Sequence, residues 1–299
     1  MDNAILETYK KAGAIAAQTV AFARSFIKKD MLLLEIVEKI EDKIRELGGN
    51  PAFPVNLSMN EIAAHATPAL NDTQTAFGLL KVDIGVHISG IVADTAFSID
   101  LENNEENKAL IASAENALKK ATMLVKTNKQ VRIREIGRTI STEIESRGFQ
   151  PIRNLSGHSI ESFNLHAGIT VPNYDNAQEK VLDLGVYAIE PFATLLTGAG
   201  MVRDGKRSGI YTLRKESPVR DPTAREILRY ILENYQTLPF CARWLQKKFG
   251  SRALLALARL EQAGILHHYP QLIEQAGKKV SQAEHTVIIT EKERIISTT

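Results

Sequence analysis

Two aspartates lie inside a segment that otherwise has the composition of a buried β-hairpin. Residues 77–100 read FGLLKVDIGVHISGIVADTAFSID, with apolar and β-branched residues on both sides of a central HISG, which predicts two strands joined by a tight turn. If Ile88 and Ser89 form the turn, Asp83 and Asp94 face each other across the ladder. Like charges on opposite residues destabilise a sheet, so this pair needs a compensating interaction.

Several compensations are compatible with the hairpin alone. One carboxyl can have a raised pKa, a lysine or arginine from elsewhere can pair with the aspartates, or both strand faces can be exposed to water. A divalent cation is the fourth possibility, because carboxylates on opposite residues, about 4.5–5.5 Å apart at Cβ, suit bridging ligation. The choice between these interpretations depends on the other segments of the chain.

The composition is that of an ordinary soluble globular protein. The 299 residues allow one large domain with a smaller companion, and the net charge of +2 is too small to indicate a polyanionic partner for the whole chain. The single cysteine, Cys241, excludes an intrachain disulfide framework and fits a reducing compartment. No apolar run reaches the roughly 18 residues of a membrane span, and the N-terminus does not have the order of a signal peptide. We expect a cytoplasmic monomer without DNA or membrane contacts.

Helical and extended segments alternate along the chain, which predicts an α+β protein. Apolar residues recur at helical spacing in two helices within 3–47 and again within 102–128 and 133–147. Extended apolar segments are expected at 51–57, 184–192 and 280–290.

Residues 209–274 have a different character and predict a small helical, winged-helix-like insert. Three short helices are expected at 223–235, 240–249 and 251–262, followed by a terminal apolar strand. The insert has ten basic and six acidic residues, a net charge of +4. A solvated surface is the default interpretation of this excess, and weak contact with RNA or the ribosome is the alternative.

Residues typical of metal ligands occur in several predicted core strands. Glu190 and Glu284 each lie in an apolar segment, and His158 and His166 lie in a strand-and-loop context that matches no zinc-finger spacing. An unpaired buried carboxylate is costly, whereas a dication neutralises and coordinates several together. A set of two aspartates, a histidine and two glutamates suits two divalent ions, and the imidazole favours Mn, Fe, Co or Zn over Mg or Ca.

Together these segments resemble the type 2 methionine aminopeptidases, metallopeptidases of the pita-bread fold, in their compact archaeal form. The motifs that match are PAFP, NEIAAHATP, KVDIGVHISG, SGH, HAG, IEPF and EHT, with TLPFCARWL and YP in the insert. The resemblance spans nearly the whole chain. It implies two pseudo-symmetric halves, each with antiparallel strands backed by helices, in a catalytic domain of residues 1–208 and 275–299, with residues 209–274 as an inserted subdomain.

The resemblance also implies which side chains form the site. Five of them would hold two divalent metal ions, with Asp94 and Glu284 bridging both: Asp83, Asp94, His158, Glu190 and Glu284. Three further residues, Phe53, Leu165 and Tyr269, would line the pocket for the methionine side chain.

The histidines fall into three groups under this resemblance. His65 and His166 would contact the substrate and the tetrahedral intermediate without binding metal. The family gives no ligand role to the residues that match His87 and His285. We interpret the remaining pair, residues 267 and 268, as surface histidines.

The reaction implied is removal of the N-terminal methionine from nascent proteins when the second residue is small. Two metal ions would activate a bridging water, and Glu190 would relay its proton. The nearest enzymatic alternative is a proline-specific peptidase of the same fold, against which we weigh the position of the insert after Glu190. The alternative from another class is an inactive binding protein for RNA or ribosomes, against which we weigh the complete ligand set.

Overall fold

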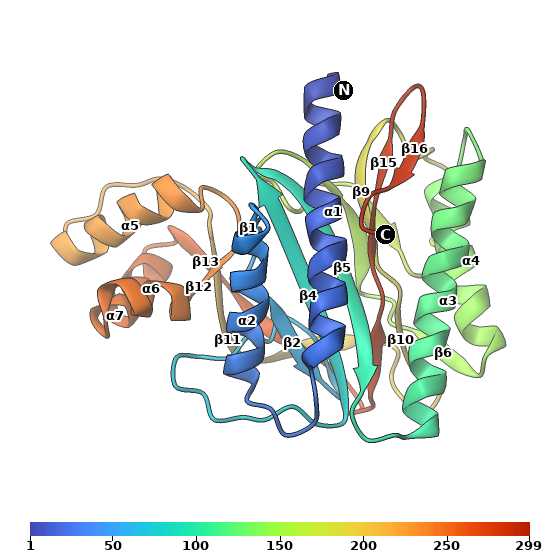
Figure 1. The fold of residues 1–299 in the computed structure, drawn as a ribbon, viewed down its shortest axis with the longest axis horizontal. Helices are drawn as coiled ribbons and strands as arrows, with labels where there is room; N and C mark the ends of the chain where they lie inside the picture. The colour runs from blue at the N-terminus through green and yellow to red at the C-terminus, as the bar shows by residue number, and fades with distance from the viewer.

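The computed structural model describes residues 1–299 and confirms an α+β fold of helices and antiparallel strands (Figure 1). The helices are α1 (Asn3–Phe26), α2 (Leu33–Glu46), α3 (Glu105–Thr127), α4 (Ile133–Ser146), α5 (Pro222–Asn234), α6 (Ala242–Phe249) and α7 (Arg252–Gln262). The strands are β1 (Asn50–Pro51), β2 (Asn56–Met59), β3 (Ile62–Ala64), β4 (Leu79–Ile88), β5 (Ile91–Asp100), β6 (Phe149–Pro151), β7 (Ser156–Ile160), β8 (Thr170–Pro172), β9 (Gly185–Ile189), β10 (Phe192–Leu195), β11 (Val202–Leu213), β12 (Phe240–Cys241), β13 (Leu266–Glu274), β14 (Val280–Gln282), β15 (His285–Ile289) and β16 (Arg294–Ile296). All strand pairings are antiparallel.

The first half of the chain packs α1 and α2 on one face of a sheet made by β1, β2, β4 and β5. Strand β4 alternates with period two: its even-numbered residues from Leu80 to Val86 join the hydrophobic cluster under the helices. Its odd-numbered residues, including Asp83, therefore point to the opposite face of the sheet. The same alternation puts Asp94 of β5 on that opposite face, because Ala93 and Phe97 belong to the cluster under the helices.

The turn of the β4–β5 hairpin lies one residue further along the chain than predicted. Ile88 pairs with Ile91, so the turn residues are Ser89 and Gly90. Both have positive φ, +49° and +85°, as a two-residue type I′ turn requires. A β-branched residue such as Ile88 disfavours that conformation, whereas glycine adopts it without steric cost.

This register means that the two aspartates of the hairpin are not opposite each other, and that prediction is wrong. Asp83 pairs with Ala96, and Asp94 pairs with Gly85. The aspartates are therefore diagonal neighbours on one face of the sheet, where long polar side chains still meet.

The second half packs α3 and α4 over the strands that follow them. Their isoleucines, leucines and alanines share a hydrophobic cluster with residues of β9, β10 and β15. The central sheet of this half has the strand order β16-β15-β9-β7-β8. Figure 1 shows the two helical pairs covering the strands of the two halves, with the C-terminal strands between them.

The insert has the three expected helices and the expected terminal strand, β13, together with two strands that sequence patterns did not predict, β11 and β12. Helices α5, α6 and α7 pack around a hydrophobic cluster of their own, and β11 pairs with β12 and β13. The second of these helices begins at Ala242 rather than at residue 240, because Phe240 and Cys241 pair with β11. Strand β11 begins at Val202 and continues to Leu213, so it spans residue 209, where the chain was predicted to divide. The division at that residue stays a prediction.

A buried ion pair connects the insert to the first half. Arg243 of α6 donates to both carboxylate oxygens of Glu41 on α2, at 3.0 and 2.7 Å, and to the carbonyl of Pro68 at 3.1 Å. Trp244 Nε1 donates to the same carboxylate at 2.8 Å. The side chains of Arg243 and Glu41 are only 1% and 2% exposed. We call this group the Arg243–Glu41 latch.

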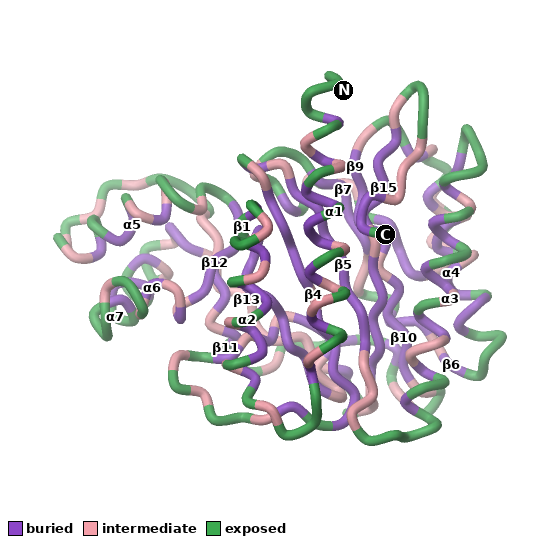
Figure 2. The backbone as a smooth tube through the Cα atoms, viewed as in Figure 1, coloured by how far each residue is buried: buried purple, intermediate pink, exposed green.

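Burial follows the layers of the fold. Strands β4, β5, β9 and β15 are buried along most of their length, while β11, β13 and β16 are only partly buried. The outer faces of the helices and the loop tips are exposed (Figure 2). None of the helices has the length and apolar character needed to span a membrane.

Candidate metal centre

Strand β5 is joined to the segment between β14 and β15 by hydrogen bonds that bring distant residues together. The backbone N–H of Glu284 donates to the carbonyl of Ala96 at 2.9 Å. The Thr286 hydroxyl donates to the Asp94 carbonyl and accepts from the Asp94 N–H, both at 2.8 Å. Asp94 and Thr286 are 192 residues apart in the chain, so this junction depends on the tertiary fold.

The polar side chains on this face converge on one point. One ligand atom each of Asp94, His158 and Glu284 lies within 4.8 Å of the other two. His158 Nε2 is 3.7 Å from Asp94 Oδ2 and 3.6 Å from Glu190 Oε1. Asp83, on the neighbouring strand, lines the same cavity.

The four carboxylates lack positively charged partners. Neither lysine nor arginine forms an ion pair with any of them, and one oxygen in each of three, Asp83 Oδ1, Asp94 Oδ1 and Glu284 Oε1, is buried without a hydrogen-bond partner. Burial raises the pKa of Asp83 to about 7. Burial, and then the neighbouring carboxylates, raises the pKa values of Asp94, Glu190 and Glu284 well above their ordinary range.

These observations test the interpretations that the hairpin left open. Surface exposure and pairing with a basic side chain are both excluded by the burial and the contacts of the carboxylates. Raised pKa values, the remaining alternative, do occur in all four carboxyls of the protein by itself. A divalent cation fits the residues better, because it supplies the missing charge and coordinates the unpartnered oxygens.

His158 reaches the centre from β7, where a glycine allows close strand packing. A Cβ at Gly157 would overlap the carbonyl oxygen of Ala188 on β9. Burial and the nearby His166 lower the pKa of His158 to about 3, so its ring is neutral, as metal ligation requires. The two rings are in edge contact, with centroids 4.4 Å apart.

The metal-centre residues open into a cavity of about 310 Å³. The cavity is lined by all ten residues that were predicted from the sequence to form the site: Phe53, His65, Asp83, Asp94, His158, Leu165, His166, Glu190, Tyr269 and Glu284. The sequence therefore identified which side chains share one cavity, and their individual roles stay predictions.

His65 has a backbone conformation that is uncommon for a residue other than glycine. Its φ is +60°, its Nδ1 is 3.3 Å from the carbonyl oxygen of Pro270, and its ring meets the edge of Tyr269 with centroids 5.3 Å apart. Burial, and secondly His166, lowers the pKa of His65 to about 4. The ring is therefore a fixed, neutral hydrogen-bonding group in the wall of the cavity.

The apolar side of the cavity depends on a glycine of the hairpin. Phe53 lies directly over Gly85, where any Cβ would overlap the phenyl ring. Leu165 and Phe53 are both buried and belong to one hydrophobic cluster. The position of Gly85, opposite Asp94, thus brings the aromatic wall next to the carboxylates.

Sequence reasoning missed several residues around the centre. Gln282 Nε2 donates to Asp83 Oδ2 at 3.4 Å, Thr286 fixes the backbone of Asp94, and Asn56 lines the cavity. A glutamine, threonine or asparagine within a strand gives no distinctive sequence signal. Histidines 267 and 268, interpreted from the sequence as surface residues, lie half-buried in β13 and do not line the cavity.

Comparisons with known proteins identify the family of this site. The model of metallopeptidase family M24 matches residues 7–291. The chain belongs to metallopeptidase family M24. Its M24 relatives include a methionine aminopeptidase of Methanocaldococcus jannaschii, 44% identical over 96% of this chain and 97% of the relative. Another is the methionine aminopeptidase of Pyrococcus abyssi, 47% identical over 97% of each chain.

Solved structures confirm the pita-bread fold expected for an M24 chain. A thermophilic Arx1 superposes with a TM-score of 0.84 at 16% identity, covering 99% of this chain and 91% of that one. The methionine aminopeptidase of Thermotoga maritima gives 0.70 at 21% identity, with coverages of 100% and 98%. The prolidase of Pyrococcus furiosus gives 0.62 at 18% identity, with coverages of 100% and 64%.

The M24 assignment and the archaeal relatives confirm the resemblance drawn from the motifs. The protein is a metal-dependent aminopeptidase, a hydrolase of peptide bonds at chain N-termini. The buried group of Asp94, His158 and Glu284 is its candidate site for divalent metal.

Proposed function

We propose that this protein removes the initiator methionine from nascent proteins whose second residue is small. The observation that carries the proposal is the cavity itself, in which four carboxylates without basic partners adjoin an apolar wall around Phe53, and three of the four have a buried oxygen without a hydrogen-bond partner. Such a cavity suits a thioether side chain next to a hydrolytic centre. Nascent chain N-termini are then the partners of the site.

Two divalent ions, from among Co, Mn, Fe and Zn, are proposed as cofactors. The residues that would hold them are Asp83, Asp94, His158, Glu190 and Glu284, with Asp94 and Glu284 shared between the two. When bound, such ions supply a nucleophilic hydroxide at neutral pH by lowering the pKa of water.

The chain's own residues would move the proton and stabilise charge. Glu190, whose carboxylate is next to His158, is proposed to accept the proton of the attacking water and to pass it to the leaving amine. His166 would donate a hydrogen bond to the developing oxyanion, and His65, held by Pro270, would orient the scissile amide.

The pocket for the first side chain is proposed to be formed by Phe53, Leu165 and Tyr269, which line the cavity. An apolar pocket of this kind rewards an unbranched side chain but discriminates weakly against isosteres, since one methylene is worth about 1–3 kcal/mol. Rejection of large second residues would then come from the space available beyond the scissile bond.

The remaining proposals concern organisation and location. Residues 1–208 and 275–299 are proposed as the catalytic domain of a cytoplasmic monomer, and residues 209–274 as the insert. Because the insert has a net charge of +4, its surface is proposed to contact the ribosome transiently.

Peptide hydrolysis tests the proposed function directly. We expect release of methionine from Met-Ala-Ser but not from Met-Lys-Ser, dependent on added Mn, Fe or Co and abolished by a chelator. Cleavage of Xaa-Pro dipeptides in place of Met-Ala-Ser would support a proline-specific peptidase. Metal-independent RNA binding without hydrolysis would support an inactive binding protein.

Two histidine variants separate metal binding from transition-state stabilisation. His158→Ala should lower both metal content and turnover, because it removes a ligand. His166→Ala should keep the metal content and lower kcat by about a hundredfold, as expected when one oxyanion donor is lost. Metal analysis of both purified variants, with kcat measured on Met-Ala-Ser, checks the assignment, and full activity in either variant would contradict it.

A further inference from the structure

Asn56 lies at the edge of the metal centre and has no part in the mechanism proposed above. It is 5% exposed and lines the cavity. Its Nδ2 donates to the carbonyl of Pro54 at 2.9 Å, while its Oδ1 is buried without a hydrogen-bond partner. Reversing the amide would set its oxygen against the Pro54 carbonyl, so the contact fixes Oδ1 as the free atom.

The free oxygen of Asn56 is next to another one. Asn56 of β2 pairs with Asp83 of β4, and directly paired residues project from the same face of a sheet. Gln282 donates to Asp83 Oδ2, but Asp83 Oδ1 has no partner. Asp83 Oδ1 is among the oxygens proposed to hold metal, whereas Asn56 Oδ1 is an amide acceptor beside it for which the protein provides no donor. The free amide oxygen is therefore complementary to a group that brings an N–H bond.

The strand order separates Asn56 from the proposed metal ligands on β5 and beyond. Strand β4 lies between β2 and β5, so Asn56 and Asp94 are on opposite sides of Asp83. Neighbouring strands are about 4.8 Å apart, which leaves Asn56 roughly 10 Å from β5. Asn56 therefore lines the cavity on the side of Asp83 that is away from β5.

We propose that Asn56 Oδ1 accepts a hydrogen bond from the free α-amino group of the substrate. Asn56 is then a further substrate-binding residue, and it favours peptides with an unblocked N-terminus. Phe53, three residues before Asn56 in the same segment, lines the proposed side-chain pocket. One stretch of chain therefore binds both the amino group and the side chain of the substrate's first residue. The inference rests on the proposed function, because it takes the ligand to be an N-terminal methionine.

The test compares methionine with 4-(methylthio)butanoic acid, which is methionine without its amino group. Binding of each to Mn²⁺-loaded protein is measured by titration calorimetry. In Asn56→Ala the Kd for methionine should rise at least about tenfold, as expected for loss of a hydrogen bond to a charged group. The Kd for the desamino compound should stay within about twofold of its wild-type value.

Ser58→Ala is the matched control. Ser58 is on the same strand and the same face, and its Oγ is also buried without a partner, but it does not line the cavity. This variant should leave both Kd values unchanged. If Asn56→Ala lowers Tm, Asn56→Leu, which fills the same space without the oxygen, carries the same comparison.

Three results would overturn the inference. They are an equal loss of affinity for both compounds, a wild-type protein that does not distinguish them, and a weaker Kd for Mn²⁺ in Asn56→Ala, which would make the amide a determinant of metal binding. The proposed function is judged separately, since cleavage of Met-Ala-Ser by the wild-type protein can succeed while Asn56→Ala binds methionine normally.

Discussion

Two of the places where the protein buries charged groups are built in opposite ways. In the Arg243–Glu41 latch, the guanidinium donates a hydrogen bond to each oxygen of the glutamate, and Trp244 donates one more to Oε2. In the metal centre, four carboxylates crowd around one histidine, and buried oxygens of Asp83, Asp94 and Glu284 have no partner at all.

This difference indicates what each group is for. A buried charge that has partners within the protein connects parts of the fold, and removing one partner lowers the free energy of unfolding. Buried carboxylates that the protein leaves unsatisfied are destabilising by themselves and become favourable when a cation binds. Burial of charge alone therefore does not identify a ligand site, whereas several carboxylates without internal partners that line one cavity do.

Removing one carboxylate from the centre should give the largest effect on activity. Asp94→Asn keeps the size of the side chain but removes a charge that would bridge the metals, so kcat/KM should fall at least about a thousandfold. The stripped variant should be as stable as the stripped wild-type protein or more stable, because a costly buried group is gone. Peptide hydrolysis and urea denaturation check both parts, and a clear loss of stability in the stripped variant would erase the contrast with the latch.

Removing one partner from the latch should give the largest effect on stability. Glu41→Ala leaves the Arg243 guanidinium buried without its carboxylate and should lower the free energy of unfolding by about 3–5 kcal/mol. The double variant Glu41→Leu with Arg243→Met should lose much less, because no charge remains buried. Equal losses in the single and double variants would show that packing, and not charge pairing, dominates at this position.

The pH dependence of metal stabilisation should sharpen the comparison further. The raised pKa of Asp83, about 7, and the raised pKa values of the other three carboxyls mean that the metal-free fold retains protons that the unfolded chain has lost. For Asp83 this stabilisation is complete below the ordinary carboxyl pKa and disappears as the pH rises through about 7. A metal ion takes the place of those protons, so the rise in Tm on adding Mn²⁺ should be larger at pH 8 than at pH 6. Scanning calorimetry checks this trend, and a rise that shrinks toward pH 8 would contradict the raised pKa values.

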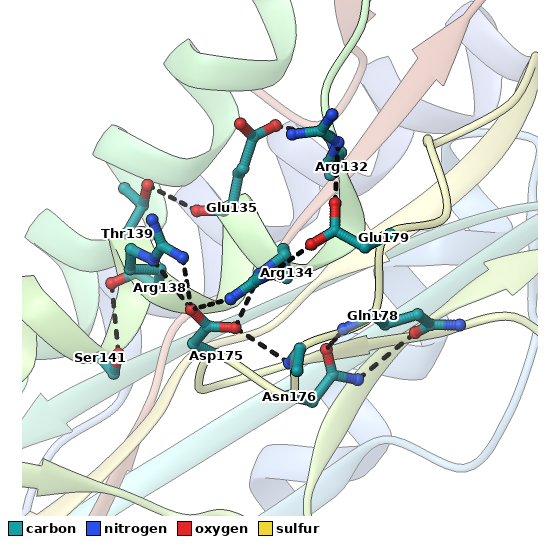
Figure 3. Close-up of polar contacts among 11 residues, drawn as sticks. Arg132, Arg134, Glu135, Arg138, Thr139, Ser141, Asp175, Asn176, Gln178 and Glu179 are labelled. Atoms are coloured by element: carbon teal, nitrogen blue, oxygen red, sulfur yellow. Dashed lines mark hydrogen bonds and ion pairs between the residues drawn. The ribbon is translucent and has the colours of Figure 1, made fainter.

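A surface charge cluster should give the smallest effect. Asp175 accepts bidentate hydrogen bonds from Arg134, both at 3.1 Å, and further bonds from Arg138 on the same helix (Figure 3). Because this cluster is open to solvent, Asp175→Ala should lower Tm by no more than about 2 °C, and less at high salt. Asp183→Ala, whose only ion pair is 3.9 Å long, is the control, and a loss at Asp175 as large as that at Glu41 would break the distinction between buried and exposed pairs.

The sequence signals for the residues that line the cavity are chemical. A carboxylate in an apolar strand, such as Asp83 or Glu284, is visible without any structure. The turn at Ser89 and Gly90 was also readable, since a type I′ turn requires positive φ at both positions. Choosing Ile88 as a turn residue ignored that requirement.

The contacts between distant segments could not be predicted in this way. Glu41 lies in an amphipathic helix among other charged residues, and only the fold brings Arg243, 202 residues away, to it. Likewise, nothing in the local sequence assigns Gln282 to Asp83. Strand β11 was missed because the first part of its span is rich in charged residues, which obscure a strand pattern.

The junction between β5 and residues 282–286 also determines when the enzyme can begin to work. The hydrogen bonds that Asp94 forms with Thr286 exist only after the 192 residues that follow Asp94 have been synthesised. A ribosome-bound precursor that has not reached this stretch has the first hairpin but no Glu284 beside it. During translation, the candidate metal centre therefore cannot form from the first half of the chain alone.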